Sequence, residues 1–107
     1  MKRGDLVTVA LQGDYGKPRP ALVVQSDLFD EHASVSIAPV TSALVPAPLF
    51  RIDLEPGPGT GLRKPSQVMV DKVQTVAREK LGPSFGRADE AALHAVDRAL
   101  RLWFGLA

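Results

Sequence analysis

Cysteine is absent from this sequence, and several kinds of site are excluded with it. Without thiols the chain can form no disulfide scaffold, no thiolate zinc site and no cysteine nucleophile. Histidine is scarce, since only His32 and His94 occur, and their surroundings favour a strand connection and a helix surface rather than a catalytic pair. The spacing of acidic residues and histidines matches no metal-ligand pattern, so we predict no metal and no cofactor.

Long apolar runs are also missing. No window approaches the length of a membrane span, and Met1 to Asp5 leads into a strand without the apolar region of a signal peptide. We therefore expect a cytoplasmic protein with no membrane contact. The 107 residues are 45% hydrophobic and 23% charged, which suits a single domain over residues 1–107. The net charge is only +1, so any basic surface must be local.

Short strands are predicted for most of the chain, because alternating or continuous apolar runs are separated by segments rich in glycine and proline. The predicted strands are residues 5–11, 21–25, 35–40, 49–54, 67–70 and 74–76. Ala21 to Val24 is apolar without a break, which is typical of a strand covered on both faces. Pro39 indicates an edge or a bulge in the third strand. Glu55 to Gly61 is predicted to be a wide, mobile turn.

The last part of the chain changes to a helical period. Apolar residues recur there at spacings of three and four, which predicts an amphipathic helix. These residues are Leu93, Val96, Leu100 and Trp103. Asp89 is the expected N-cap and Gly105 the expected C-terminal stop. The fold class that follows is mainly β, a small, strongly curved barrel or folded sheet with a C-terminal helix packed on it.

Arg19 is flanked by prolines in the segment Lys17-Pro18-Arg19-Pro20, just before the second predicted strand. Both prolines lack an N–H and restrict φ, so this guanidinium is poorly placed to be ordinary strand surface. Its planar fork of donors matches a phosphate group. We interpret Arg19 as an anion-binding residue; an ion pair at a turn is the alternative.

Four segments occur in one order and with fitting separations. They are Arg3 to Val7, Lys17 to Val24, Pro39 to Ser42 and Ser66 to Val76. Together they resemble the MazF/PemK family of toxins, and the likeness extends through the C-terminal helix to nearly the whole chain. The resemblance implies an SH3-like barrel of the CcdB/MazF type, a homodimer, and metal-independent, sequence-selective cleavage of single-stranded RNA such as mRNA. It also implies a cognate antitoxin that blocks the site with a peptide.

The resemblance assigns site residues as well. It implies that Arg19 is the essential arginine, that Thr41 is the catalytic-site hydroxyl, and that Asp71 is the general base found in some members. The expected RNA-binding residues are Lys17, Ser42, Arg63, Lys64, Ser66, Gln67 and Lys72. Cleavage through the 2′-hydroxyl needs a proton acceptor, donors for the phosphorane charge and help for the leaving 5′-oxygen. Because a guanidinium is a poor proton donor near neutrality, we assign Arg19 charge stabilisation.

The chain departs from the family pattern at Met69, where certain members carry an arginine. This departure leaves the general acid open among Lys72, Arg63 and Lys64. The glycine-flanked loop at residues 12–17 is expected to gate the site. Tyr15 within it is a candidate for stacking on a base.

Two other function classes stay open on the sequence alone. CcdB-like toxins share the fold and poison DNA gyrase by binding it without catalysis, and Trp103 near the C-terminus is compatible with that class. A non-catalytic SH3-like module that binds RNA or an acidic peptide is the third class. The segment Lys17 to Pro20 favours the nuclease, because neither alternative needs an arginine held in this way.

Overall fold

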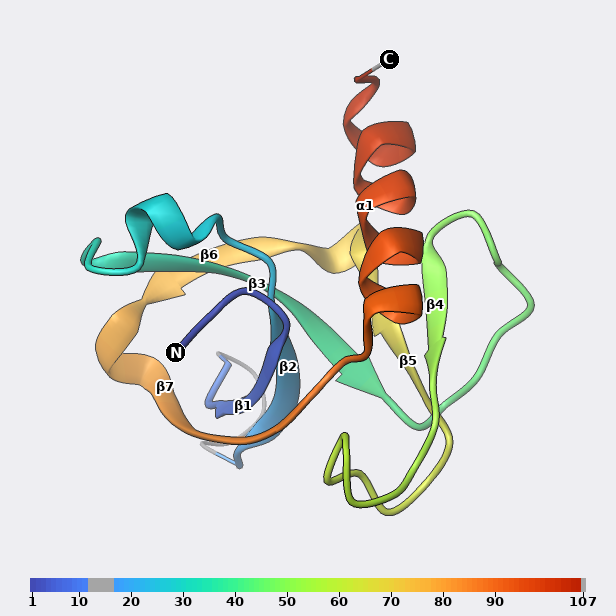
Figure 1. Cartoon of the computed structure of the whole chain (residues 1–107), viewed down its shortest axis with the longest axis horizontal. Helices are drawn as coiled ribbons and strands as arrows, with labels where there is room; N and C mark the ends of the chain where they lie inside the picture. The colour runs from blue at the N-terminus through green and yellow to red at the C-terminus, as the bar shows by residue number, and fades with distance from the viewer. Residues whose placement is uncertain (12–16, 107) are drawn as a thin grey trace.

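The structure of the protein is a computed structural model that describes residues 1–11 and 17–106. Within these residues the chain forms seven strands, three short 3₁₀ turns and one α-helix (Figure 1). The strands are β1 (Asp5–Val9), β2 (Arg19–Val23), β3 (Ser34–Thr41), β4 (Arg51–Leu54), β5 (Ser66–Met69), β6 (Gln74–Ala77) and β7 (Leu81–Arg87). The turns are η1 (Asp27–Phe29), η2 (Val70–Lys72) and η3 (Arg78–Lys80), and the helix is α1 (Glu90–Phe104).

Strand β3 organises the sheet, whose hydrogen-bonded order is β4-β5-β3-β2-β1-β7, with β6 also paired to β3. One side of β3 pairs with β2. Along the other side, Ser34 to Ile37 pair with β6, whereas Val40 and Thr41 pair with β5. All these pairings are antiparallel, and the sheet curls into an open barrel with α1 packed against β4 and η2 (Figure 1). The expected fold class, mainly β with a C-terminal helix, is confirmed.

Pro39 does not lie at an edge or in a bulge, as the sequence predicted, because β3 has neighbours on both sides. It pairs with Ala21 of β2 on one side. On the other side it lies between Ile37, where pairing to β6 ends, and Val40, where pairing to β5 begins. A residue without an N–H is tolerated at such an interruption of the ladder.

The core lies on both faces of the first three strands. Leu6 and Leu22 belong to a cluster that includes residues of α1, whereas Val7 and Ala21 belong to a second cluster inside the curled sheet. All four side chains are fully buried. The prediction that the apolar run beginning at Ala21 forms a strand covered on both faces is confirmed.

Helix α1 begins and ends at the predicted residues. The Asp89 carboxylate accepts a hydrogen bond from the Ala92 N–H at 2.8 Å, and Gly105 has the left-handed φ of 70° typical of a helix C-cap. The last turns of α1 extend past the sheet (Figure 1). No helix in the described part of the chain is long and apolar enough to cross a membrane.

Strand β7 was not predicted, because Gly82, Pro83 and Gly86 give its sequence the composition of a turn. It nevertheless pairs with β1 at one end of the sheet, with two shifts of register. The glycines are required by close packing. A Cβ at Gly82 would meet the Thr8 hydroxyl, and one at Gly86 would meet the backbone carbonyl of Thr60.

The segment from Glu55 to Gly61 is a hydrogen-bonded loop rather than the wide, mobile turn that the sequence predicted. The Gly61 N–H bonds to the Gly57 carbonyl at 2.8 Å, and the Arg87 N–H bonds to the Gly59 carbonyl at 3.0 Å. The second bond attaches the loop to β7. Its backbone polar groups thus have partners that the glycine-rich sequence does not reveal.

We predict that Gly86→Ala lowers the free energy of unfolding by about 1–3 kcal/mol, because the added methyl group would push the Thr60 backbone away from β7. Gly59→Ala is the matched control, since a Cβ there meets nothing within 4 Å. It should change stability by less than about 0.5 kcal/mol. Urea unfolding of both variants measures the difference, and equal stabilities would contradict the packing of this loop on β7.

Candidate functional site

A cleft of about 580 Å³ opens where β3 changes partners. Its walls come from the start of β2, the end of β3, the end of β5, the turn η2 and the start of β6. A volume of this size accepts a small ligand or part of a chain. Its apolar lining consists of Leu11, Pro20, Pro39, Val40 and Met69.

Positive charge is concentrated in this cleft. The cationic lining residues are Arg19, Arg63, Lys64 and Lys72, and no carboxylate occurs among the described lining residues. Four cations outside the cleft pair with acids. These pairs are Lys2–Asp30, Arg3–Asp97, Arg51–Asp71 and Arg87–Asp5. A chain of net charge +1 therefore presents one strongly basic cleft suited to a polyanion.

Arg19 is the first residue of β2, which begins two residues before the strand predicted from Ala21. It is exposed, lies opposite Val9 of β1, and contributes to the cleft lining. The strand pairing fixes its backbone from one side, and Pro18 and Pro20 restrict the backbone on either side of it. The guanidinium is thus attached to a rigid part of the sheet.

Thr41 ends β3, and Ser42 follows it in the cleft wall. The Thr41 hydroxyl oxygen accepts a hydrogen bond from the Ala43 N–H at 3.0 Å. Its own hydrogen can still be donated to an anionic oxygen, because a hydroxyl both accepts and donates. Ser42 is exposed. Together the two residues add neutral donors to the cationic cleft.

Ser66 lines the cleft but is buried, and its hydroxyl donates to the Lys64 carbonyl at 2.9 Å. This bond joins the start of β5 to the segment that carries Arg63 and Lys64. The RNA contact expected of Ser66 stays a prediction, and its internal bond restrains the backbone at Lys64.

Asp71, the general base implied by the resemblance, pairs with Arg51 of β4. Arg51 Nε and Nη2 donate to the two carboxylate oxygens at 2.8 and 3.2 Å, and the side chains of Arg51 and Asp71 are only 12% and 17% exposed. These bonds lower the pKa of Asp71 and raise the pKa of Arg51. A carboxylate that must give up this pair to accept a proton is a poor general base.

Lys17, Gln67 and Asp71 are not among the described residues that line the cleft, whereas the other predicted site residues are. Lys17 is exposed near the start of β2. Gln67 is 7% exposed, and its amide is bonded to Val45 and Asp53. Residues 12–16 of the predicted gate at residues 12–17, with Tyr15 among them, lie outside the described residues.

Gln74 lines the cleft and was not predicted to do so. It begins β6 and lies opposite Ile37 of β3, so its place depends on a pairing between distant parts of the sequence. Its amide donates to the Lys72 carbonyl at 3.5 Å. The only local signal for this residue is that it follows Lys72 by two positions.

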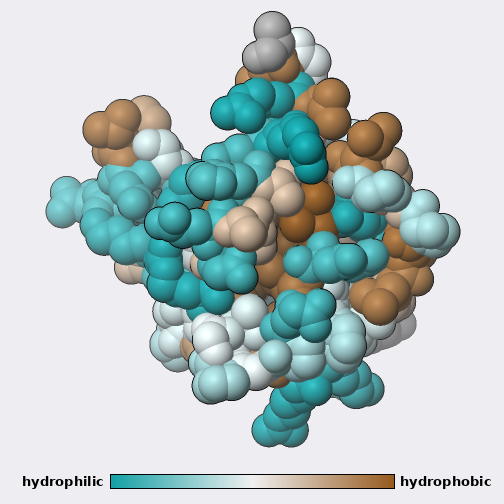
Figure 2. Space-filling view, turned by 45° about the vertical axis from the view of Figure 1, so that its right-hand side comes forward, coloured by the Kyte–Doolittle hydropathy of each residue, from teal (hydrophilic) through white to brown (hydrophobic). Residues whose placement is uncertain are grey.

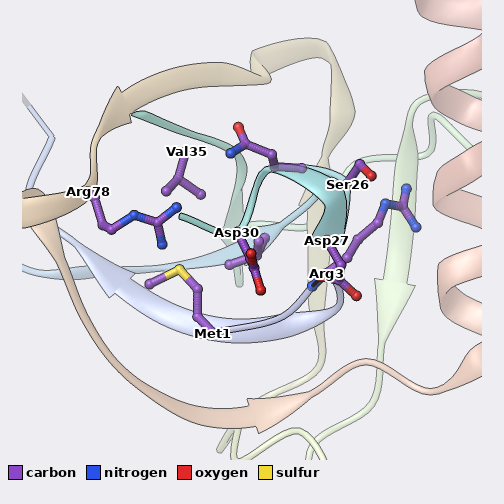
Figure 3. Close-up of a pocket in the computed structure, with 9 residues that line it drawn as sticks. Met1, Arg3, Ser26, Asp27, Asp30, Val35 and Arg78 are labelled. Carbon is purple, nitrogen blue, oxygen red and sulfur yellow. Dashed lines mark hydrogen bonds between the residues drawn. The ribbon is translucent and has the colours of Figure 1, made fainter. Parts of the chain in front are cut away.

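A second, much smaller cavity of about 10 Å³ lies near the N-terminus and is lined by Met1, Arg3, Asp27, Asp30 and Arg78, among others (Figure 3). It has room for no more than about one water molecule. Among residues 1–11 and 17–106, no three or more acidic, histidine or cysteine side chains form a group that could hold a metal ion. The larger cleft is therefore the candidate site.

Comparison with known proteins agrees with the resemblance noted in the sequence. The family described as PemK-like, MazF-like toxin of type II toxin-antitoxin system matches residues 2–104. A probable endoribonuclease MazF of Mycolicibacterium smegmatis is 48% identical over 100% of this chain and 99% of its own length. Endoribonuclease MazF9 of Mycobacterium tuberculosis is 29% identical over 99% of this chain and 98% of its own length.

Solved structures share the fold. A mycobacterial endoribonuclease in complex with its cognate antitoxin superposes with a TM-score of 0.83 at 23% identity, covering 100% of this chain and 97% of that one. Mycobacterium tuberculosis toxin MazF-mt6 gives a TM-score of 0.82 at 24% identity, covering 96% of this chain and 98% of that one. The curled sheet with a C-terminal helix is thus common to these proteins.

We predict that Asp71→Asn lowers the free energy of unfolding at pH 7 by about 1–3 kcal/mol, because it removes a charge-assisted bidentate pair. The pKa of Asp71 is lower in the folded than in the unfolded chain. The pair therefore stabilises the fold above about pH 4, and this stabilisation is lost as pH falls toward the folded-state pKa.

Urea unfolding at pH 7 and at a series of lower pH values measures this effect, and the wild-type advantage should shrink below about pH 4. Asp30→Asn is the control, because it breaks the more exposed pair with Lys2 and should cost at most about 1 kcal/mol. An Asp71→Asn loss that is independent of pH would contradict the assignment.

Proposed function

The chain belongs to the PemK-like, MazF-like toxin family of type II toxin–antitoxin systems and is an endoribonuclease, and we propose that its basic cleft cuts single-stranded RNA such as mRNA. The proposal depends on one observation above all. Four cations and three hydroxyl-bearing residues line a single cleft without a described carboxylate. Such a lining suits the continuous negative charge of an RNA backbone.

We propose that the reaction uses the RNA's own 2′-hydroxyl. The 2′-oxygen attacks the adjacent phosphorus, the bond from phosphorus to the 5′-oxygen breaks, and the products carry a 2′,3′-cyclic phosphate and a 5′-hydroxyl. Negative charge grows on the phosphoryl oxygens in the transition state. Fixed donors aimed at that charge typically contribute about 10²–10³-fold to the rate.

Arg19 is proposed to bind those oxygens through its guanidinium fork, with the Thr41 hydroxyl as a second donor. Lys72, Arg63 and Lys64 are proposed to neutralise the flanking phosphates, with Ser42 beside them and Lys17 at the cleft's periphery. One of these cations would also assist the leaving 5′-oxygen, since Met69 lacks a charge. The described lining offers no carboxylate, imidazole or thiolate to hold a divalent cation, which supports metal-independent cleavage.

Asp71 is proposed to serve the reaction indirectly, as a positioning residue. Its pair with Arg51 connects β4 to η2, and the Val70 N–H is bonded to the Phe50 carbonyl at 3.0 Å. These bonds fix the short turn that carries Lys72 into the cleft. Replacing Asp71 should therefore weaken cleavage through Lys72 without removing the reacting groups.

A cognate antitoxin is the proposed regulator, placed with the RNA in the cytoplasm. One solved relative is an endoribonuclease in complex with its cognate antitoxin. In this chain the cationic cleft is the surface best suited to an acidic peptide segment, because the charge that attracts RNA also attracts carboxylates. RNA and antitoxin would then compete for one site.

A homodimer is proposed from the apolar surface near the end of α1. Leu102, Phe104 and Leu106 are more than half exposed there, and Figure 2 shows apolar areas interrupted by polar ones on one face of the molecule. A groove of about 510 Å³ runs between α1 and the turn from η2 to β6, and Phe29, Leu100 and Phe104 line it. Exposed apolar residues grouped along a groove are typical of an association surface.

We predict that the wild type cuts a long single-stranded RNA at discrete sites in EDTA and leaves DNA of the same sequence intact. Arg19→Ala should lower kcat/KM by about 10²–10³-fold, because the main phosphate donor is lost. Arg19→Lys keeps the charge but loses the fork, and should lose at least about 10-fold. Sequencing of the cleavage ends with gel kinetics measures both.

Arg98→Ala is the charge-matched control, since Arg98 is exposed on α1 and is not among the cleft residues. Near-normal cutting by Arg19→Lys would argue against bidentate phosphate binding. Intact RNA with the wild type would overturn the proposed activity. In that case a gyrase-dependent arrest of growth would favour the CcdB-like alternative, and RNA binding without cutting would favour a binding module.

We predict that Phe104→Asp shifts the protein toward a monomer, because a carboxylate would have to be buried in the apolar groove. Light scattering after size-exclusion chromatography measures the mass. Leu49→Asp is the control, since this similarly exposed residue lies outside the groove. A wild-type mass of one chain, or a dimer unaffected by Phe104→Asp, would contradict this surface.

A further inference from the structure

We propose that Gln67 is a positioning residue for the cleft, acting through the loop that follows Thr41 and Ser42. This loop, residues 43–49, leads from the end of β3 toward β4 and is called the β3–β4 loop below. The inference rests on the proposed function, because Thr41 and Ser42 are the donors that the loop would hold in place. It replaces the RNA contact expected of Gln67 from the sequence with a role inside the protein.

The β3–β4 loop has few means of fixing itself next to the cleft. Pro46 and Pro48 have no N–H to donate. Leu44 and Leu49 are 52% and 67% exposed, so apolar burial contributes little at these positions. The loop's own backbone bonds, such as that from the Ala47 N–H to the Val45 carbonyl, join Val45 and the residues that follow it in the sequence.

Gln67 supplies the missing attachment. Its Oε1 accepts from the Val45 N–H at 3.0 Å, and its Nε2 donates to the Val45 carbonyl at 3.0 Å. The side-chain amide therefore bonds both polar groups of one residue, as a neighbouring strand would. Val45 is thereby fixed only three residues beyond Ser42.

The amide belongs to a strand that is paired on both sides. Gln67 lies in β5 opposite Thr41 of β3 on one side and Asp53 of β4 on the other. Its Nε2 also donates to Asp53 Oδ1 at 3.0 Å, and the side chain is 7% exposed. A buried amide with its donors and its acceptor satisfied has one favourable orientation, so it can transmit the rigidity of the sheet to the loop.

The arrangement is specific for glutamine. Glutamate would keep the acceptor for the Val45 N–H but lose both donors and place its charge beside Asp53. Methionine would keep a similar volume and lose all three bonds. The double variant Asp53→Asn with Gln67→Glu restores a bond of opposite polarity between the two side chains and keeps the bond to the Val45 N–H.

The test compares Gln67→Met with Gln25→Met. Gln25 is a matched control, because its amide also makes three bonds to backbone groups: to the Phe29 and Ser34 carbonyls, and from the Ser36 N–H. It is not among the cleft residues, but it lines the groove beside α1, so its effect on association must be checked. Both variants are assayed well below their unfolding midpoints, after light scattering has shown the same oligomeric state.

We expect Gln67→Met to lower kcat/KM for RNA by about 10- to 100-fold and to broaden the set of cut sequences, since small displacements of donors cost rates of this order. Gln25→Met should keep the wild-type rate and cut sites. Gln67→Glu should be impaired like Gln67→Met, and adding Asp53→Asn should recover part of the loss. Should Gln67→Met fail to fold, the comparison of Gln67→Glu with the double variant Gln67→Glu, Asp53→Asn tests the inference instead.

Two measurements do not depend on cleavage. Exchange of the Val45 amide hydrogen should be faster in Gln67→Met than in Gln25→Met, and binding of a DNA oligonucleotide that cannot be cut should be weaker. If the wild type cuts no RNA, the proposed function fails. Amide exchange at Val45 and binding of the DNA oligonucleotide still test whether Gln67 positions the loop. The inference would be overturned if Gln67→Met exchanged the Val45 amide hydrogen at the same rate as the wild type. It would also be overturned if Gln67→Met kept the kcat/KM and the cut sites of the wild type.

Discussion

The change of partner along β3 is the constraint on which the other features of this protein depend. Up to Ile37 this strand is paired with β6, and from Val40 it is paired with β5. The two partner strands separate there, with η2 between them, and the sheet cannot be flat where one strand is shared in this way. The cleft occupies the separation, and the largely buried strands β3 and β5 contribute to its walls.

Two kinds of interaction, an ion pair and a set of amide hydrogen bonds, hold the segments that border the cleft. An ion pair, Arg51 with Asp71, fixes the turn that carries Lys72, whereas a neutral amide, Gln67, fixes the loop after Ser42. The use of a neutralised ion pair and a neutral amide has an electrostatic consequence. The acid that steadies Lys72 is already neutralised by Arg51, and the amide adds no charge. The positive field of the cleft is therefore not weakened by the groups that support it.

Much of the fold could be predicted because it depends on local patterns. The apolar run from Ala21, the capping residues Asp89 and Gly105, and the helical spacing between them all act within a few residues. Strand β7 could not be predicted, since its glycines are selected by contacts with Thr8 and Thr60 from other parts of the chain. Local composition alone describes that segment as a turn.

The same distinction applies to the site. Arg19, Thr41 and the cations of the cleft carry their chemistry in their residue types and could be proposed from the sequence. The bonds of Asp71 and Gln67 depend on the register between strands that are distant in the sequence. The sequence alone does not show these internal partners, so it predicts that the Asp71 carboxylate and the Gln67 amide act on RNA. Gln74 was overlooked for the converse reason, because only the pairing of β6 with β3 brings it to the cleft.

The irregular pairing of β7 affects how copies of this protein can associate with one another. This strand ends the sheet, and an open, regular edge of that kind would be a template for pairing with a second molecule. Pro83 offers no donor, and the two register shifts against β1 bend the edge out of regular alignment. Association through this edge is discouraged, so pairing of two molecules along β7 does not compete with apolar contact near α1.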